Sequence, residues 1–231
     1  LDRLEELVVE DYNMSSSLMG LGRSLKQFTR LTKLNVGCVI LNQVLPPLMP
    51  FISNLTALQH LVLWNRSFSR LNSDGMKKVV SHLSKMSQLS CLHVGHLVNG
   101  NDEGSVKLLC ELISSLPHLT DLRLPFNDFT SQSIVMLCGY ISKLNGLTHL
   151  DLSGSTLDEG SMKVLGKVTR LPILHLELSN ITWESNGFEA FGSQFANWSH
   201  LKSLNLADSP QRISKEWSTL LAKGLSNLTS L

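Results

Sequence analysis

The chain has 231 residues, of which 42% are hydrophobic and 17% are charged, and its formal net charge at pH 7 is +1. This composition is too apolar for a disordered polymer, and no apolar run in the sequence approaches the roughly 18 residues that a membrane span requires. Neutralising a row of phosphates needs a clustered basic face, and the sequence has no basic run. We therefore expect no nucleic-acid partner and no membrane insertion.

One apolar motif, L-x-x-L-x-L with apolar substitutions, recurs along the whole sequence. In chain order its copies begin at Leu4, Leu31, Leu58, Leu89, Leu119, Leu147, Ile173 and Leu201, and a ninth opens at Leu228. Successive copies start 26 to 31 residues apart, a regularity that scattered leucines would not keep. Such a period is the signature of a repeat architecture. The sequence therefore predicts one leucine-rich-repeat domain over residues 1–231, with about eight repeats and a truncated ninth.

The pattern of each repeat predicts a strand, a turn, a helix and a loop that leads back to the next strand. The last two apolar positions of the motif alternate with polar ones, which is the period of a strand with one buried face. Apolar residues at spacings of three and four predict the helices that precede the next strands. The clearest sets, in chain order, are Met76, Val79, Val80, Leu83 and Met86; Ile134, Leu137, Cys138, Ile141 and Leu144; and Phe188, Phe191, Phe195 and Trp198. Polar loops at 72–75, 99–104 and 158–161 supply Asn, Asp and Ser side chains that can cap helix starts.

A single repeat of this kind cannot bury its own apolar stripe, so neighbouring repeats must stack. Parallel strands lie about 4.8 Å apart, whereas packed helices need about 10 Å, so the stack has to curve with the strands inside. The predicted fold is α/β: a curved leucine-rich-repeat solenoid, or horseshoe, with parallel strands on the concave face and helices on the convex face.

Repeats of about 28 residues with a full outer helix resemble the ribonuclease-inhibitor class, which includes the C-terminal repeats of NLR innate-immune receptors. Segments 116–124 and 147–155 carry the resemblance most clearly. The family places Asn or Cys three residues after the last leucine of the motif, where the side chain ties neighbouring backbones together. Only Asn127 fits, and Asn65 and Asn180 come one place early. We therefore expect less regular loops after the strands.

In such a solenoid the strand residues between the buried leucines point to the concave face. One column begins with Glu6 and Lys33, the next with Val8 and Asn35, and the third with Glu10. These columns predict a mixed, solvent-facing surface for partner binding. Its candidate residues are His60, Trp64, His93, Asp121, Arg123, His149, Asp151, His175 and Glu177.

Two of these features allow alternative interpretations. Trp64 is either an exposed interface anchor or packs on a neighbouring loop. His149 and His175, with Asp151 and Glu177 beside them, have the residue types of a metal site or a pH sensor. A surface ladder of histidines is the interpretation we favour, so we predict no metal site.

Motifs of the common nucleotide-binding, hydrolase and metalloprotease families are absent from the sequence. Serine, histidine and aspartate occur on the same predicted face, but nothing in their spacing fixes a nucleophile next to a base. We predict no enzyme, no catalytic residue and no cofactor.

The resemblance implies a protein-recognition module, the ligand-sensing or autoinhibitory repeat region of an intracellular NLR-type receptor. Its partner would be a protein ligand or the receptor's own other domains. Neither end has a polar cap, so we expect a piece of a longer protein, and oligomerisation through further domains stays open. The alternatives are a substrate-recruiting scaffold of a ubiquitin ligase, a GTPase regulator, or a fragment of an extracellular repeat receptor.

Two features of the sequence disagree about the compartment. The four cysteines are scattered, which favours buried thiols in a reducing compartment and hence the cytoplasm. Six N-x-S/T sequons favour an extracellular chain instead. They begin at Asn13, Asn54, Asn65, Asn180, Asn197 and Asn227. We predict a cytoplasmic protein and keep the extracellular chain as the alternative.

Overall fold

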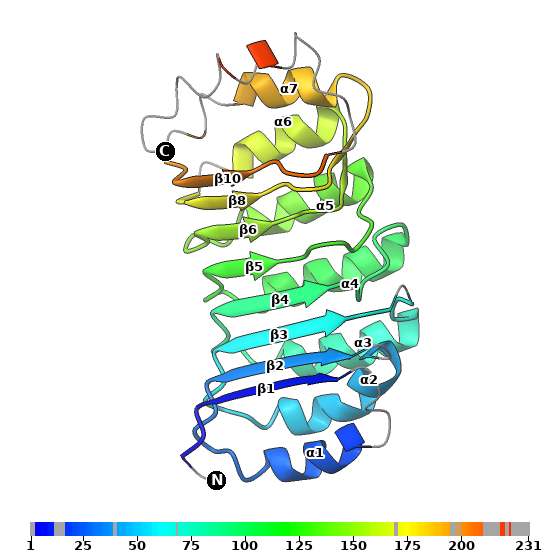
Figure 1. The fold of residues 1–231 in the computed structure, drawn as a ribbon, viewed down its shortest axis with the longest axis vertical. Helices are drawn as coiled ribbons and strands as arrows, with labels where there is room; N and C mark the ends of the chain where they lie inside the picture. Colours follow the sequence, from blue (N-terminus) through cyan, green and yellow to red (C-terminus); the bar gives the residue numbers. More distant parts are fainter. Residues whose placement is uncertain are drawn as a thin grey trace.

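The computed structural model describes residues 3–11, 17–38, 41–67, 69–168, 171–194, 198, 200–209, 218–219 and 222. Strands and helices alternate along the chain, and each strand is laid beside the previous one (Figure 1). The strands form one face and the helices the other. In Figure 1 the helices extend past the strands at both ends of the stack, so the sheet is the inner, concave face. The predicted leucine-rich-repeat solenoid is confirmed.

Eight parallel strands form the sheet, in the order β1-β2-β3-β4-β5-β6-β8-β10. They are β1 (Glu6–Asp11), β2 (Lys33–Cys38), β3 (His60–Asn65), β4 (Cys91–Gly95), β5 (Asp121–Arg123), β6 (His149–Asp151), β8 (His175–Glu177) and β10 (Ser203–Asn205). The register places equivalent motif positions opposite one another: Leu34 pairs with Leu61 and Leu122 with Leu150. Each of the eight predicted motif copies therefore contributes one strand. The ninth, at Leu228, lies outside the described residues.

The helices between these strands cover the other face of the sheet. They are α1 (Ser17–Leu25), α2 (Leu41–Ile52), α3 (Ser73–Leu83), α4 (Glu103–Ser114), α5 (Ser131–Ile141), α6 (Glu159–Val168) and α7 (Gly187–Gln194). Asn72 and Asp102 cap α3 and α4 by accepting hydrogen bonds from the backbone N–H groups of Gly75 and Ser105. These caps confirm the helix starts expected from the polar loops. Phe195 of the predicted aromatic stripe lies outside the described residues.

The core is a continuous ribbon of leucines between the sheet and the helices. The middle leucine of each motif is completely buried or nearly so from β2 to β8. Helix residues such as Leu109 and Leu137 complete the same layer from the other side, and both are fully buried. Aromatic residues gather in the core near the C-terminal end, where Trp198 packs edge-on against Phe191.

The loops after the later strands are regular, although the asparagine column is degenerate. In five successive repeats the residue two places after the last strand leucine has a positive φ. These residues are His96 (53°), Phe126 (55°), Gly154 (73°), Asn180 (54°) and Asp208 (56°). Four of them donate a backbone hydrogen bond to the next repeat, as Phe126 does to the Ser153 carbonyl at 2.8 Å. For these five repeats the expectation of less regular loops was wrong, because the main chain makes the link that the family assigns to a side chain. We call these five residues the turn ladder.

Asparagine side chains support this junction at two places. Asn127 is fully buried and accepts hydrogen bonds from the Leu97 and Val98 N–H groups, at 2.9 and 2.8 Å. Its amide donates to the Val94 carbonyl at 2.7 Å. Asn65, one place out of the expected column, is also fully buried and donates to the His96 carbonyl at 3.1 Å.

A second parallel pair lies beyond the turns, formed by β7 (Thr156–Leu157) and β9 (Thr182–Trp183). No sequence pattern predicted this pair, because each strand has only two residues. Within the described residues, no helix is long and apolar enough to cross a membrane.

We predict that Leu150→Ala will destabilise the domain by about 3 kcal/mol, because it leaves a cavity between the sheet and the helices. Urea unfolding followed by circular dichroism measures the loss. Val135→Ala is the control, because Val135 is 36% exposed on α5 and its truncation should cost well under 1 kcal/mol. Equal losses for the two variants would contradict the described core.

Asn127→Ala should also cost about 3 kcal/mol, since it leaves two buried N–H groups and one carbonyl without a partner. The same unfolding measurement applies. Asn145→Ala removes an exposed amide from the loop before β6 and should change little. A loss below about 0.5 kcal/mol for Asn127→Ala would show that this side chain does not hold the junction.

Candidate functional site

The concave face carries the predicted columns in the predicted register. The first column passes from His60 through Cys91 and Asp121 to His149 and His175. The second passes from Val62 through His93, Arg123, Asp151 and Glu177. The structure therefore brings all nine candidate residues onto one sheet face, eight of them in these two columns. Trp64 lies in the third column, opposite Gly37 and Gly95.

These side chains are less exposed than the sequence suggested. All nine candidates are half-buried, because neighbouring side chains in a ladder cover one another. The third column, which begins with Glu10, departs most from the expected solvent-facing surface: its members Pro125 and Ser153 are buried. The usable surface is therefore the first two columns together with the edge formed by Trp64.

Trp64 packs on its neighbours. Its ring lies edge-on to His93 and to His96, with 5.3 Å between ring centroids in each case. It also meets Phe126 at 6.4 Å. A side chain on Gly95 would collide with the indole, since an added Cβ would lie 2.4 Å from it. Of the two interpretations of Trp64, packing against the neighbouring repeats is the one that the geometry supports.

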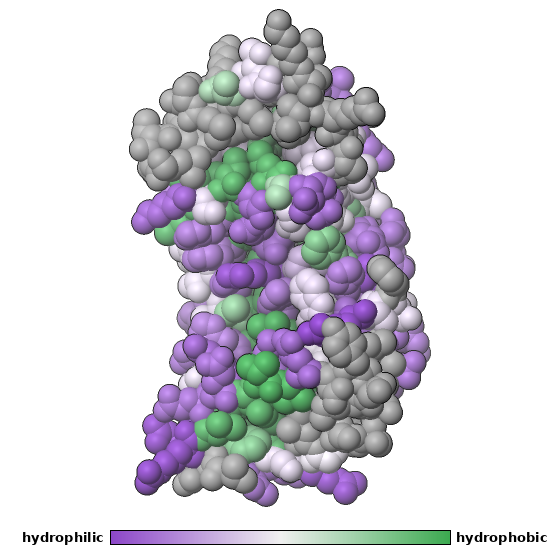
Figure 2. Space-filling view, in the orientation of Figure 1, coloured by the Kyte–Doolittle hydropathy of each residue, from purple (hydrophilic) through white to green (hydrophobic). Residues whose placement is uncertain are grey.

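A hydrophobic patch lies over β1 to β3 in the N-terminal half of the face, with hydrophilic residues beside it (Figure 2). A shallow depression there is lined by Leu7, Val8, Leu34, Val62 and Cys91 together with the polar or charged residues Glu6, Lys33, Asn35 and His60. Val8 is 54% exposed, an unusual state for a large aliphatic residue. Burial raises the pKa of the Cys91 thiol to about 11, with the Asp121 carboxylate adding to the shift, so this thiol stays protonated.

The centre of the face is fixed by an ion pair within one strand. Arg123 donates from Nε and Nη2 to the two carboxylate oxygens of Asp121, both at 2.8 Å. This bidentate pairing raises the pKa of Arg123. Next to it, burial and the Arg123 charge lower the pKa of His93 to about 4. At neutral pH His93 is therefore an uncharged imidazole.

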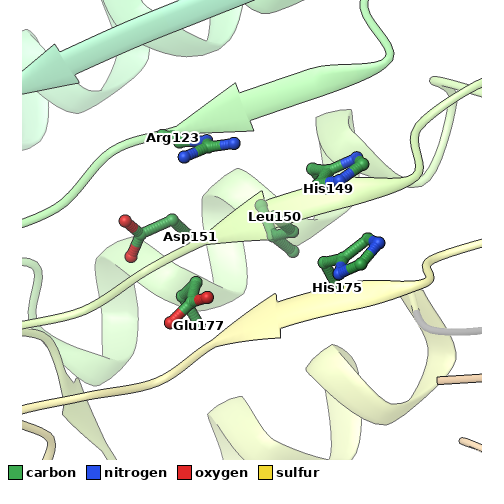
Figure 3. Close-up of a pocket in the computed structure, with 6 residues that line it drawn as sticks. All are labelled: Arg123, His149, Leu150, Asp151, His175 and Glu177. Carbon is green, nitrogen blue, oxygen red and sulfur yellow. The ribbon is translucent and has the colours of Figure 1, made fainter. Parts of the chain in front are cut away.

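The C-terminal half holds a small hollow over β5, β6 and β8 (Figure 3). Its lining consists of Arg123, His149, Leu150, Asp151, His175 and Glu177. We call it the β6–β8 hollow. The rings of His149 and His175 are stacked, with centroids 4.1 Å apart and planes 12° from parallel. Burial lowers the pKa of His149, and the neighbouring His175 lowers it further.

Two carboxylates line the hollow on the side away from the imidazoles (Figure 3). Asp151 and Glu177 are register partners on β6 and β8. Burial raises the pKa of Asp151, and Glu177 adds to the rise, while hydrogen bonds from Ser153 and the charge of Arg123 oppose it. Within the described ranges, no group of three or more His, Cys, Asp and Glu side chains is arranged to hold a metal ion.

Three of the six sequon asparagines and all four cysteines lie within the described residues. Asn65 is fully buried with its amide donating to two carbonyls, so the folded domain cannot accept a glycan there. Asn54 is exposed, and its amide donates to the Pro50 carbonyl. Asn13, Asn197 and Asn227 lie outside the described residues. All four cysteines are thiols rather than halves of disulfides, and three of them are buried, as the sequence predicted.

Sequence reasoning missed the contacts between repeats that shape the rim of the face. His96 and Phe126, both members of the turn ladder, stack with centroids 5.0 Å apart. Arg70 reaches two repeats onward to Asp128, with Nη2 at 2.5 Å from the carboxylate. The partners are far apart in sequence and follow no motif, so only the fold brings them together.

Folding stability should fall as the pH drops from about 6.5 to about 4, in part because of His93. Its pKa in the folded chain lies below the ordinary value, so the unfolded chain binds more protons in this window. This proton binding stabilises the unfolded chain relative to the folded one. Urea unfolding at several pH values measures the slope, and His93→Gln should flatten it. His118→Gln, which removes an exposed histidine, is the control. An unchanged slope in His93→Gln would contradict the described environment.

No protein-family model matches the sequence. Over 159 residues the chain is 31% identical to human NACHT, LRR and PYD domains-containing protein 5, a match that covers 66% of this chain and 13% of that protein. The chain thus spans a small part of this relative. Among solved structures, the tropomodulin C-terminal domain of Caenorhabditis elegans superposes with a TM-score of 0.47 at 12% identity, over 66% of this chain and 92% of that one. By its own structure the chain is a leucine-rich-repeat solenoid, and in sequence it is similar to a protein named for such repeats.

Proposed function

We propose that this domain is a protein-recognition module of an intracellular NLR-type receptor of innate immunity. In this proposal its concave face binds a protein ligand or the receptor's own other domains, and the domain catalyses no reaction. The observation that carries the proposal is the 31% identity to a protein whose name combines NACHT, LRR and PYD domains.

The surface supports recognition of a protein better than chemistry on a small molecule. A catalytic cleft encloses its substrate, whereas the depressions here are shallow and lie along an open sheet. An exposed aliphatic patch at one end and a charged hollow at the other offer apolar and polar contacts on one face, as protein interfaces require. The cytoplasm is the proposed compartment, since the four cysteines are thiols rather than halves of disulfides and Asn65 is inaccessible to glycosylation.

Site-specific photo-crosslinking in the full-length protein tests the proposal. A photoreactive amino acid at Asn35 or Asn205 on the concave face should form crosslinks to another protein or to another domain of the same chain, identified by mass spectrometry. The same group at Lys78 or Glu111, on exposed positions of α3 and α4, is the control and should give far fewer. Equal yields at the two sets of positions would count against concave-face recognition.

A further inference from the structure

The β6–β8 hollow has an excess of negative charge that the chain itself does not neutralise. On strands β5, β6, β8 and β10, the two concave columns present Asp121, Asp151 and Glu177 against the single cation Arg123. Arg123 is committed to Asp121 by two hydrogen bonds of 2.8 Å. Within the described part of the chain, no ion pair reaches Asp151 or Glu177.

The residues that flank this carboxylate pair on β10 carry no charge. Across from Glu177 on β10 stands Asn205, and across from His175 stands Ser203. The protein as a whole carries a formal charge of only +1, so its overall field neither attracts nor repels a charged ligand strongly. The negative charge is therefore a local property of this hollow.

Two hydrogen bonds favour a tautomer of His149 in which the ring is a further acceptor. The Thr148 hydroxyl donates to the Thr120 carbonyl at 3.0 Å. The same hydroxyl oxygen lies 2.8 Å from Nδ1 of His149, and with its proton on the carbonyl we expect it to accept from Nδ1. In the neutral ring Nε2 then carries a lone pair and no proton. The hollow thus presents two carboxylates and one imidazole acceptor, and its lining cation is already paired.

We infer that the β6–β8 hollow binds an arginine side chain presented by the partner protein, with the guanidinium between the Asp151–Glu177 carboxylates and the imidazole pair. This inference rests on the proposed function and names the chemistry of the partner. Residues two apart on a strand lie about 6.6 Å from one another, a span that a planar guanidinium with donors on both sides can bridge and a compact ammonium cannot. A carboxylate ligand would instead meet Asp151 and Glu177 as like charges.

The same groups make the binding depend on pH. As the pH falls, protonation of His149 puts positive charge beside the guanidinium and removes the Nε2 acceptor. Protonation of Asp151, whose pKa burial raises, then removes one carboxylate. Asp121, Arg123 and Glu177 are the other charged groups that face the hollow from the three strands that line it. Both changes weaken binding in acid, and neither strengthens it.

The test uses fluorescently labelled hexa-arginine, hexa-lysine and hexa-glutamate peptides with the folded domain at low ionic strength, followed by fluorescence anisotropy. At pH 7.5 hexa-arginine should bind most tightly, and the double variant Asp151→Asn/Glu177→Gln should weaken it about fivefold or more. Asn at 151 keeps the oxygen that accepts from the Ser153 N–H, so the turn is preserved. Circular dichroism confirms folding of each variant.

The control Asp74→Asn/Glu103→Gln removes the same charge from exposed positions on α3 and α4 and should leave affinity unchanged. Lowering the pH to 5.5 should weaken hexa-arginine binding to the unmodified domain. In the free protein, long-range ¹⁵N NMR should show neutral His149 protonated at Nδ1. Equal loss in the two double variants, hexa-lysine binding as tightly as hexa-arginine, preferential binding of hexa-glutamate, or an Nε2–H tautomer would each overturn the inference.

The outcomes also separate this inference from the proposed function. Concave-face crosslinks in the full-length protein with no arginine preference in the peptides would reject only the guanidinium site. Arginine-selective binding without concave-face crosslinks would reject the recognition role and leave the site intact.

Discussion

The residue-for-residue register between neighbouring strands is the constraint on which the rest of this structure depends. Because Leu122 lies opposite Leu150 and Leu150 opposite Leu176, each repeat completes the core of the one before it. No repeat has a core of its own, and stability comes from interfaces between neighbours. The same register that stacks the leucines also aligns the residues between them, so the concave columns are a direct consequence of core formation.

These columns place different residue types at the two ends of one sheet. The N-terminal strands present Val8 and Val62 to solvent, whereas the C-terminal strands present carboxylates and imidazoles. Neither set is required by the core, since the alternate residues on each strand already fill it. Half-burial of the polar residues takes them partly out of water and so disfavours their charged forms, and this is the main physical reason that the pKa of His93 is lowered and the pKa of Asp151 is raised.

The periodic part of the fold could be predicted from sequence, and the non-periodic part could not. A spacing near 28 residues and alternation within each motif were enough to place the strands, their order and both concave columns. Helix α2 has apolar residues at helical spacing, but Pro46, Pro47 and Pro50 lie inside it and argue against a helix, since proline normally ends one. The ion pair could not be predicted either. The sequence places charges of both signs on this face, but only the structure shows that Arg123 pairs with Asp121. The deeper burial of the third column follows from Trp64 and the turns, which no motif describes.

The turn ladder has a consequence for how the surface can change. Five different residue types occupy the left-handed position, and the hydrogen bonds that join one repeat to the next there are made by peptide groups. A link made by the main chain survives most substitutions of the side chain that it carries. Side chains around the concave rim can therefore be substituted without loss of the curvature. Such substitutions allow new binding specificities to arise on an unchanged scaffold.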